Sequence, residues 1–388
     1  MKKIWFIPLL ALTLYGQDFE SFKQEALQKS PYLKANALKM QTAKEQSQII
    51  TRYKNPTLGL EASEFVQNTP SSKDNGYRVE LTQPIRLWGV GGDREALSNA
   101  QVQSAQQSIT LTKAAFLREL SLRYVAYKRM AHLKALAIKE LEIAKKIATI
   151  SQARYENGTI AKVKYLQATM DMQRVANSVN TLDVAKIKSY YELLAFAGVE
   201  NLQEIDTEYS FELTKGDETG SAELAYLDAQ QKLSIAQAQL RENKLEWIDL
   251  RAEFEKEPDQ DIYRVGVNIP LVIFNANTQE KKIAKLKAAQ QTHLYEQKEH
   301  ANTLTLTKIT QMIEKLSVVE QSTQSLLISQ KKLLEMYEDG YKIANINLIE
   351  LQLIKNQMIS TQEKLIDIQT QKEMNIIEHN YLTGAYNE

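Results

Sequence analysis

Histidine side chains would bind a metal or shuttle protons most readily, but their spacing in this chain argues against both. The four histidines are His132, His293, His300 and His379. Only His293 and His300 could share a helix face, and a pair seven residues apart on a charged helix is usually solvated surface, not a metal site. Serine and aspartate are abundant, but no nucleophile elbow or triad order occurs. The sequence predicts no catalytic residue, no metal site and no cofactor, so an enzyme is not expected.

The amino-acid composition limits the possible partners and the kind of fold. The chain has 388 residues, with 48 basic and 48 acidic side chains, so charge favours neither nucleic acid nor an anionic surface as the main partner. It has only 13 glycines and 7 prolines, which favours long regular elements. The sequence has no cysteine, so packing or assembly must stabilise the protein.

The N-terminus predicts export. Two lysines follow Met1, and a short apolar run from Ile4 to Leu14 precedes Gly16. This pattern is typical of a secretory signal peptide, here predicted over residues 1–16, and the apolar run is too short to span a bilayer. No later apolar run approaches the length of a transmembrane helix. The expected locations are the periplasm, the outer membrane or the exterior.

The chain repeats one unusual segment. Tyr, Arg and Val open residues 77–88 and again residues 263–274, and proline is the eighth residue of both. About 60 residues of helix-forming sequence follow each copy. Each long stretch ends in Tyr-Glu-(Asn/Asp)-Gly, at 155–158 and 337–340, and a second helical run follows. Duplication on this scale predicts two structural repeats.

Each repeat contains a predicted strand pair. Apolar and polar residues alternate over about 57–66 and 77–84, and again over about 248–255 and 262–270. Strands of roughly ten residues with one apolar face are typical of outer-membrane barrels. Four strands cannot close a barrel, and open edges do not persist in lipid. Several chains must therefore share one barrel if the strands lie in a membrane.

Long helices make up the rest of the prediction. A first helix is expected from Asp18 to about Arg52, and helical hairpins over about 93–197 and 278–383. Apolar residues at coiled-coil spacing predict the seam of the second hairpin. These residues are Ile309, Met312, Leu316, Val319, Thr323, Leu326, Gln330, Leu333 and Tyr337. The predicted organisation is a signal peptide, 1–16; a first repeat, 17–205; a linker, 206–220; and a second repeat, 221–388.

These features resemble the TolC family of outer-membrane efflux channels over essentially the whole mature chain. The resemblance rests on Gln83-Pro84-Ile85 before Gly91-Gly92-Asp93-Arg94, on the two tips, and on the runs 163–168 and 348–351 that follow the tips. It implies a mainly α fold with β strands, in which a homotrimer forms a 12-strand outer-membrane β-barrel and a periplasmic α-helical tunnel. A periplasmic adaptor and an inner-membrane pump of the RND type would be its partners. Residues 81–89 also resemble the CzcC/CusC-like branch, which exports heavy metals.

The resemblance also implies site residues. Tyr155 and Gly158 in the first tip, with Tyr337 and Gly340 in the second, would dock the adaptor. A simpler interpretation of both glycines is that a reversing helical hairpin needs a residue in the left-handed conformation. Both interpretations can hold.

Glu350 is the predicted channel constriction. In the family, carboxylates ring the periplasmic end of the channel at this place, and three copies would attract cations there. Lys164 stands at the corresponding position of the first repeat, and Leu353 where a second acid is often found. An ordinary exposed helical glutamate is the competing interpretation of Glu350.

Three functions remain open. The first is the channel of a tripartite efflux system that passes metal cations or small toxic compounds outward. The second is a type I protein-secretion duct, which the sequence does not distinguish from the first. The third is a periplasmic coiled-coil adaptor or scaffold, although adaptors usually have one hairpin flanked by compact β domains.

Overall fold

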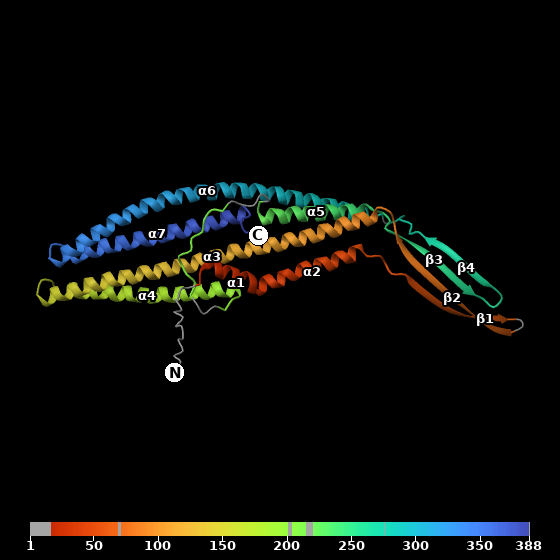
Figure 1. Ribbon diagram of the computed structural model, residues 1–388, viewed down its shortest axis with the longest axis horizontal. Helices are drawn as coiled ribbons and strands as arrows, with labels where there is room; N and C mark the ends of the chain where they lie inside the picture. The colour runs from red at the N-terminus through yellow and green to blue at the C-terminus, as the bar shows by residue number, and fades with distance from the viewer. Residues whose placement is uncertain (1–16, 69–70, 201–203, 215–219, 275, 388) are drawn as a thin grey trace, which may run out of the picture. The chain divides into compact units, whose positions relative to one another are not determined.

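The computed structural model describes residues 17–68, 71–200, 204–214, 220–274 and 276–387, so the predicted signal peptide lies outside it. Eleven helices and strands form within these residues (Figure 1). In chain order they are α1 Phe19–Lys29, α2 Pro31–Thr51, β1 Thr57–Asn68, β2 Ser71–Arg86, α3 Val90–Glu156, α4 Lys162–Ala197, α5 Ala222–Glu242, β3 Trp247–Lys256, β4 Asp261–Asn268, α6 Thr278–Lys342 and α7 Leu348–Leu382.

The predicted fold class is confirmed in its essentials, because a strand pair followed by a long helical hairpin occurs twice. The helix α3 has 67 residues and α6 has 65. At a rise of 1.5 Å per residue, each is about 100 Å long. The helix α5 was not predicted as a separate element. The proposed linker at 206–220 stays a prediction, since the structure describes only part of it.

The first predicted helix is in fact two. The helix α1 ends at Lys29, Ser30 caps it, and α2 begins at Pro31. Proline has no N–H group for a continuing helix, but its fixed φ suits the first position of a new one. The prediction of one helix from Asp18 to about Arg52 is therefore wrong at this residue.

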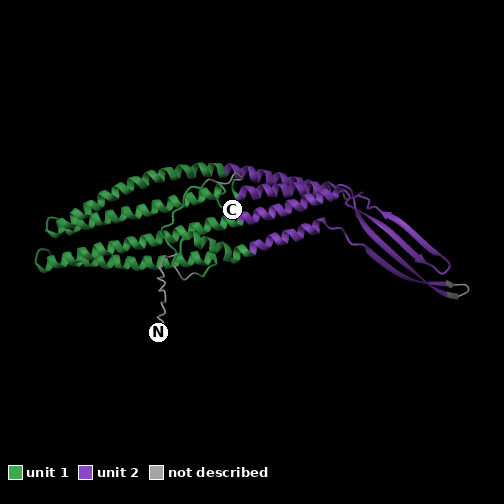
Figure 2. Ribbon diagram, viewed as in Figure 1, with its two compact units in different colours: residues 1–34, 112–221, 302–388 green, residues 35–111, 222–301 purple. Residues whose placement is uncertain are grey.

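Two compact units divide the chain differently from the repeats (Figure 2). Unit 1 contains residues 1–34, 112–221 and 302–388, and unit 2 contains 35–111 and 222–301. Both repeats contribute to each unit, because α3 and α6 supply residues to both. Unit 2 holds all four strands, and unit 1 holds both helix-to-helix turns.

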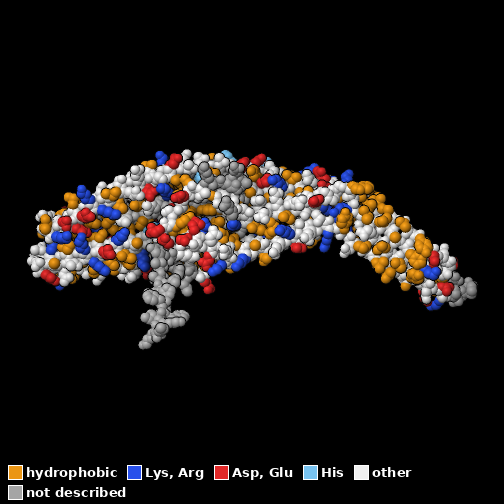
Figure 3. Space-filling model, viewed as in Figure 1, with side chains coloured by type: hydrophobic (Ala, Val, Ile, Leu, Met, Phe, Trp, Pro, Cys, Tyr) orange, Lys and Arg blue, Asp and Glu red, His pale blue; other side chains and the backbone are white. Residues whose placement is uncertain are grey.

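In unit 2 the strands form one antiparallel sheet in the order β1-β2-β3-β4. The register places the apolar residues of all four strands on one face, as the alternation predicts. That face is exposed: Leu60 keeps 73% of its surface, Tyr263 76% and Val265 82%. Hydrophobic side chains gather over the strands in the space-filling view (Figure 3). The strands β1 and β4 have unpaired outer edges within the described sheet.

In unit 1 an aromatic core joins distant parts of the chain. The ring of Phe19 lies 4.3 Å from that of Tyr124 and 5.4 Å from that of Phe211, measured between centroids. The hydroxyl of Tyr124 donates a hydrogen bond of 2.8 Å to the backbone carbonyl of Asp206. The same core reaches Leu382 near the end of α7.

The predicted seam of the second hairpin is only partly correct. Ile309 and Thr323 are buried as expected. Met312, Val319, Leu326 and Leu333 are instead 41%, 40%, 52% and 37% exposed. Residues one position later on α6 are buried in their place, namely Ile313, Leu327 and Leu334. The helix therefore has two adjacent apolar stripes, and a periodicity of three and four does not decide which one faces the chain's own core.

Candidate functional site

The first helical turn, between α3 and α4, reverses at Gly158. Its φ of 71° lies in the left-handed region, which glycine adopts without a steric cost. The N–H and hydroxyl of Thr159 both donate hydrogen bonds of 2.8 Å to the carbonyl of Arg154, which satisfies the end of α3. The left-handed role predicted for Gly158 is therefore confirmed.

The second turn, between α6 and α7, reverses elsewhere than predicted. Gly340 lies inside α6, which continues to Lys342, and the left-handed residue is Ala344, with a φ of 66°. A Cβ atom on Gly340 would lie 2.6 Å from Cδ1 of Ile346. The left-handed role predicted for Gly340 is therefore wrong, and its glycine is explained by the close approach of Ile346.

The two turns give the correct alignment of the repeats. Gly158 and Ala344 each lie two residues beyond the last helical residue. Tyr155 therefore corresponds to Tyr341, and not to Tyr337, which lies one helical turn earlier. Tyr155 is 38% exposed and stacks on Tyr165, whereas Tyr337 is half-buried against the hydrophobic core between the hairpins. The adaptor-docking role of these four tip residues stays a prediction.

Tyr341 also joins the two hairpins and was missed from the sequence. It is 1% exposed, and its hydroxyl lies 2.8 Å from Oγ of Ser151 on α3. The guanidinium of Arg154 donates a hydrogen bond of 2.8 Å to the carbonyl of Tyr341 and lies 4.6 Å from the ring centroid. Correct alignment with Tyr155 would have drawn attention to Tyr341, but nothing in the sequence indicates its burial.

Glu350 and Lys164 line the same depression between the turns, which has a volume of about 410 Å³. Arg154 also contributes to its wall. Glu350 is exposed and lies in the first turn of α7, where its N–H donates a hydrogen bond of 3.0 Å to Oδ1 of the capping residue Asn347. A carboxylate there is favoured by the helix dipole whatever else it does. Leu353, which stands where the family often has a second acid, is 55% exposed.

A buried charge cluster, unforeseen from the sequence, joins three helices. Lys355 on α7 has no exposed side-chain surface, and its Nζ lies 2.6 Å from Oδ2 of Asp171 on α4 and 3.3 Å from Oε1 of Glu140 on α3. Arg174 lies 2.9 Å from Asp171 and 3.3 Å from Glu140. Burial alone would raise the pKa of Asp171, but hydrogen bonds from Lys355 and Arg174 outweigh it and lower that pKa.

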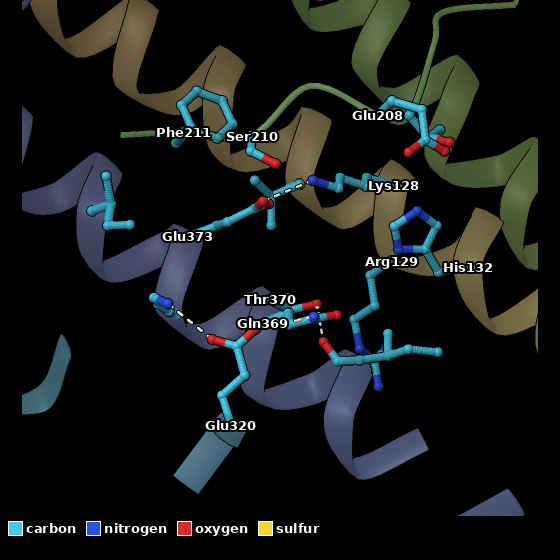
Figure 4. A pocket seen from close by; sticks show the side chains of 15 residues that line it. Lys128, Arg129, His132, Glu208, Ser210, Phe211, Glu320, Gln369, Thr370 and Glu373 are labelled. Atoms are coloured by element: carbon cyan, nitrogen blue, oxygen red, sulfur yellow. Dashed lines mark hydrogen bonds and ion pairs between the residues drawn. The ribbon is translucent and has the colours of Figure 1, made fainter. Parts of the chain in front are cut away.

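A polar pocket of about 290 Å³ contains His132 (Figure 4). Lys128 in its wall donates hydrogen bonds of 2.7 Å to Glu373 and to the carbonyl of Tyr209. Burial and the charge of Lys128 lower the pKa of His132. Although Glu208 and Glu320 also line the pocket, no group of three possible ligands suited to a metal ion occurs in the described part of the chain.

His293 is exposed, with Nδ1 3.1 Å from Oε2 of Glu296. In the described ranges, every helix is too short or too polar to cross a bilayer.

Comparison with known proteins identifies the fold. The model of the family "Outer membrane efflux protein" matches residues 23–199. The outer-membrane channel OprN is 14% identical, with a TM-score of 0.80 over 95% of this chain and 90% of that one. CusC is also 14% identical, with a TM-score of 0.79 over 94% and 91%. CmeC of Campylobacter jejuni is 15% identical, with a TM-score of 0.78 over 94% and 85%.

No curated protein matches the chain. At these identities the solved structures establish the fold alone. The family match and the structures together support the predicted TolC resemblance and outer-membrane location. CusC and OprN match equally well, so the comparisons do not favour the metal-efflux branch.

Proposed function

We propose that this chain is the outer-membrane channel subunit of a tripartite efflux system, assembled as a homotrimer. The sheet carries this proposal. A contiguous exposed apolar face is unfavourable in water, and the hydrocarbon of a bilayer is the solvent that suits it. The open edges of β1 and β4 need partners in lipid. Three copies would close them into twelve strands, as in the TolC family.

The boundaries of the apolar face fit a bilayer. Toward the strand-to-strand turns it ends at the ion pairs Lys73–Glu64, at 3.1 Å, and Lys256–Asp261, at 2.7 Å. Beyond the other ends of β2 and β4, Trp88 and Phe274 are fully exposed. Between these limits, about nine residues of a tilted strand cover roughly 25 Å, the height of an outer-membrane apolar band. Charged turns outside and aromatic residues at the opposite border agree with such a membrane.

Exposed stripes on the hairpins support assembly as well. The exposed stripe on α6 contains Met312, Val319, Leu326 and Leu333, spaced by seven residues. A second on α4 contains Val163, Leu166, Met170, Val184, Ile187 and Tyr191. Such spacing is that of a coiled-coil seam that lacks its partner helix. We propose that the neighbouring copies cover both stripes and so form the periplasmic tunnel.

The partners and cargo in this proposal rest on the family resemblance. A periplasmic adaptor would dock at the tips that contain Tyr155, Gly158, Tyr337 and Gly340, together with Ala344. An inner-membrane pump of the RND type would supply metal cations or small toxic compounds.

The purified protein is expected to be a trimer. After detergent extraction of outer membranes, light scattering coupled to gel filtration should give three times the mass of the mature chain, with both β and α signals in circular dichroism. A folded monodisperse monomer, or recovery in the soluble periplasmic fraction, would contradict the proposal and favour an adaptor.

Changing Glu350 to glutamine is expected to reduce cation preference in planar-bilayer conductance. Three carboxylates near one axis lie within a Debye length of roughly 10 Å at 0.1 M salt, so they act together on a passing ion. Block by multivalent cations from the periplasmic side should weaken. The matched variant Lys164→Gln should shift selectivity the opposite way, because Lys164 lines the same depression. Unchanged selectivity in both variants would leave Glu350 as an ordinary exposed helical glutamate.

A further inference from the structure

The polar face of the sheet carries a row of charges that alternates in sign from strand to strand. Glu61 lies on β1, Arg78 on β2, Glu253 and Glu255 on β3, and Arg264 on β4. Arg78 lies 3.0 Å from Glu61, 3.2 Å from Glu253 and 3.0 Å from Glu255. Arg264 forms ion pairs with Glu253 and Glu255.

The two ends of this row lack neighbours that its interior has. Arg78 has carboxylates on both adjacent strands. Arg264 has them on β3 alone, and Glu61 has an arginine on β2 alone, because β4 and β1 are the edges of the sheet. The side chains of Glu61 and Arg264 are 62% and 46% exposed. In the register of the described strands, they are the only charged residues on this face of β1 and β4.

We propose that Glu61 of one chain pairs with Arg264 of a neighbouring copy where the edge β1 of the first meets the edge β4 of the second. The proposal rests on the proposed function, in which these edges close a shared sheet. Four strands alternate in direction, so β4 and the next β1 run antiparallel like all other neighbours. The charges then alternate around the whole closed sheet.

The row of charges also favours a head-to-tail ring over a two-fold dimer. Head-to-tail contact of β1 with β4 joins opposite charges at every interface and closes into a ring. Contact of β1 with β1 in a two-fold dimer would bring Glu61 toward Glu61, and like charges on opposing strands are destabilising. Electrostatic complementarity of this kind fixes the register and suppresses wrong pairings.

Disulfide formation tests the contact directly, because the chain has no cysteine of its own. Two differently tagged chains, one Glu61→Cys and the other Arg264→Cys, are co-expressed, and their outer membranes are oxidised. A disulfide needs Cα atoms within about 7 Å. Within one chain these residues lie three strand spacings apart, roughly 14 Å. We expect a product that carries both tags. The control chain Asn268→Cys, further along the same face of β4, should give at least a tenfold lower yield.

Removal of either charge tests the interaction itself. Glu61→Gln or Arg264→Gln alone leaves the charge across the interface without its opposite and should lower the trimer fraction in detergent about threefold per interface. The double variant should lower it no further than either single variant does.

The outcomes separate the two proposals. An intact outer-membrane trimer without the 61–264 crosslink, or a double variant whose loss equals the two single losses combined, would overturn the ion pair and leave the channel standing. Absence of any outer-membrane oligomer for the unaltered chain would overturn the channel itself.

Discussion

Changing Lys355 to methionine is expected to lower the free energy of unfolding by about 3 kcal/mol, the lower end of the range for breaking a buried ion pair. The side chain of Lys355 has no exposed surface, so its removal leaves Asp171 and Glu140 partly buried without their main cation. Arg174 remains beside both carboxylates, which keeps the loss from being larger. Urea unfolding of the detergent-purified protein, followed by circular dichroism, measures the effect.

The difference in the free energy of unfolding between the unaltered protein and Lys355→Met should become smaller in acid. The pKa of Asp171 is lowered in the folded protein, from a usual value of 3.8. Its contribution to stability is therefore complete above that value and is lost as the pH falls through the folded pKa. Without Lys355, burial favours the protonated carboxyl, so the two proteins should converge below about pH 4.

The exposed Lys364 on the same helix is the control, and Lys364→Met should change stability by less than about 0.5 kcal/mol. An equal loss in the two variants, or a loss from Lys355→Met that does not change with pH, would contradict the role of the cluster.

Changing Gly158 to valine is expected to abolish efflux while the protein still reaches the outer membrane. The φ of 71° costs an ordinary residue about 1–2 kcal/mol, and a β-branched one more, so the turn should change its path. Ala344 at the equivalent position provides the opposite test. Ala344→Gly should stabilise the second turn by about 1 kcal/mol and leave efflux intact. Drug or metal susceptibility of cells and crosslinking to the adaptor measure both variants.

If Gly158→Val exports normally and still crosslinks to the adaptor, the first tip is not part of the docking surface. Gly340→Val tests the packing of the second turn separately from left-handed backbone strain. Its Cβ would collide with Ile346 inside the structure and so alter the turn, although Gly340 is not in the left-handed conformation.

Features that depend on local sequence were predictable. The alternation over residues 57–66 and 77–84 located both ends of β1 and the end of β2 to within about two residues, because a half-buried strand needs a period of two. The start of β2 is Ser71, about six residues before the predicted start. The long helices were equally clear, since glycine and proline are almost absent from them. Lys164 and Glu350 were predicted at corresponding positions of the two repeats, and each lies six residues beyond the left-handed residue of its turn. The two also line one depression.

Features that depend on packing were not predictable. Lys355 lies four residues after Leu351 and three before Met358, on the buried face of α7, but a lysine is expected at the surface, and only the carboxylates of two other helices explain its burial. The motif Tyr-Glu-(Asn/Asp)-Gly placed the second turn one helical turn too early, because similarity of residue types does not reveal that Gly340 continues a helix. Ser30–Pro31 was overlooked inside a stretch of helix-forming residues.

The aromatic core of unit 1 has a consequence for the timing of folding. Gln17 bonds through its backbone to Glu204 and Asp206, while Asn380 bonds to the backbone of Glu212 and Thr214. Phe19 and Leu382 belong to the same cluster, so the core needs residues from both ends of the chain. At roughly 5–20 residues per second, synthesis of such a chain takes on the order of a minute. Phe19 lacks Tyr124 and Phe211 for about the first half of that time, and the cluster lacks Leu382 until the end. The core can therefore be completed only once the whole chain is available, and a chaperone that shields exposed apolar segments would act longest on the N-terminal helix.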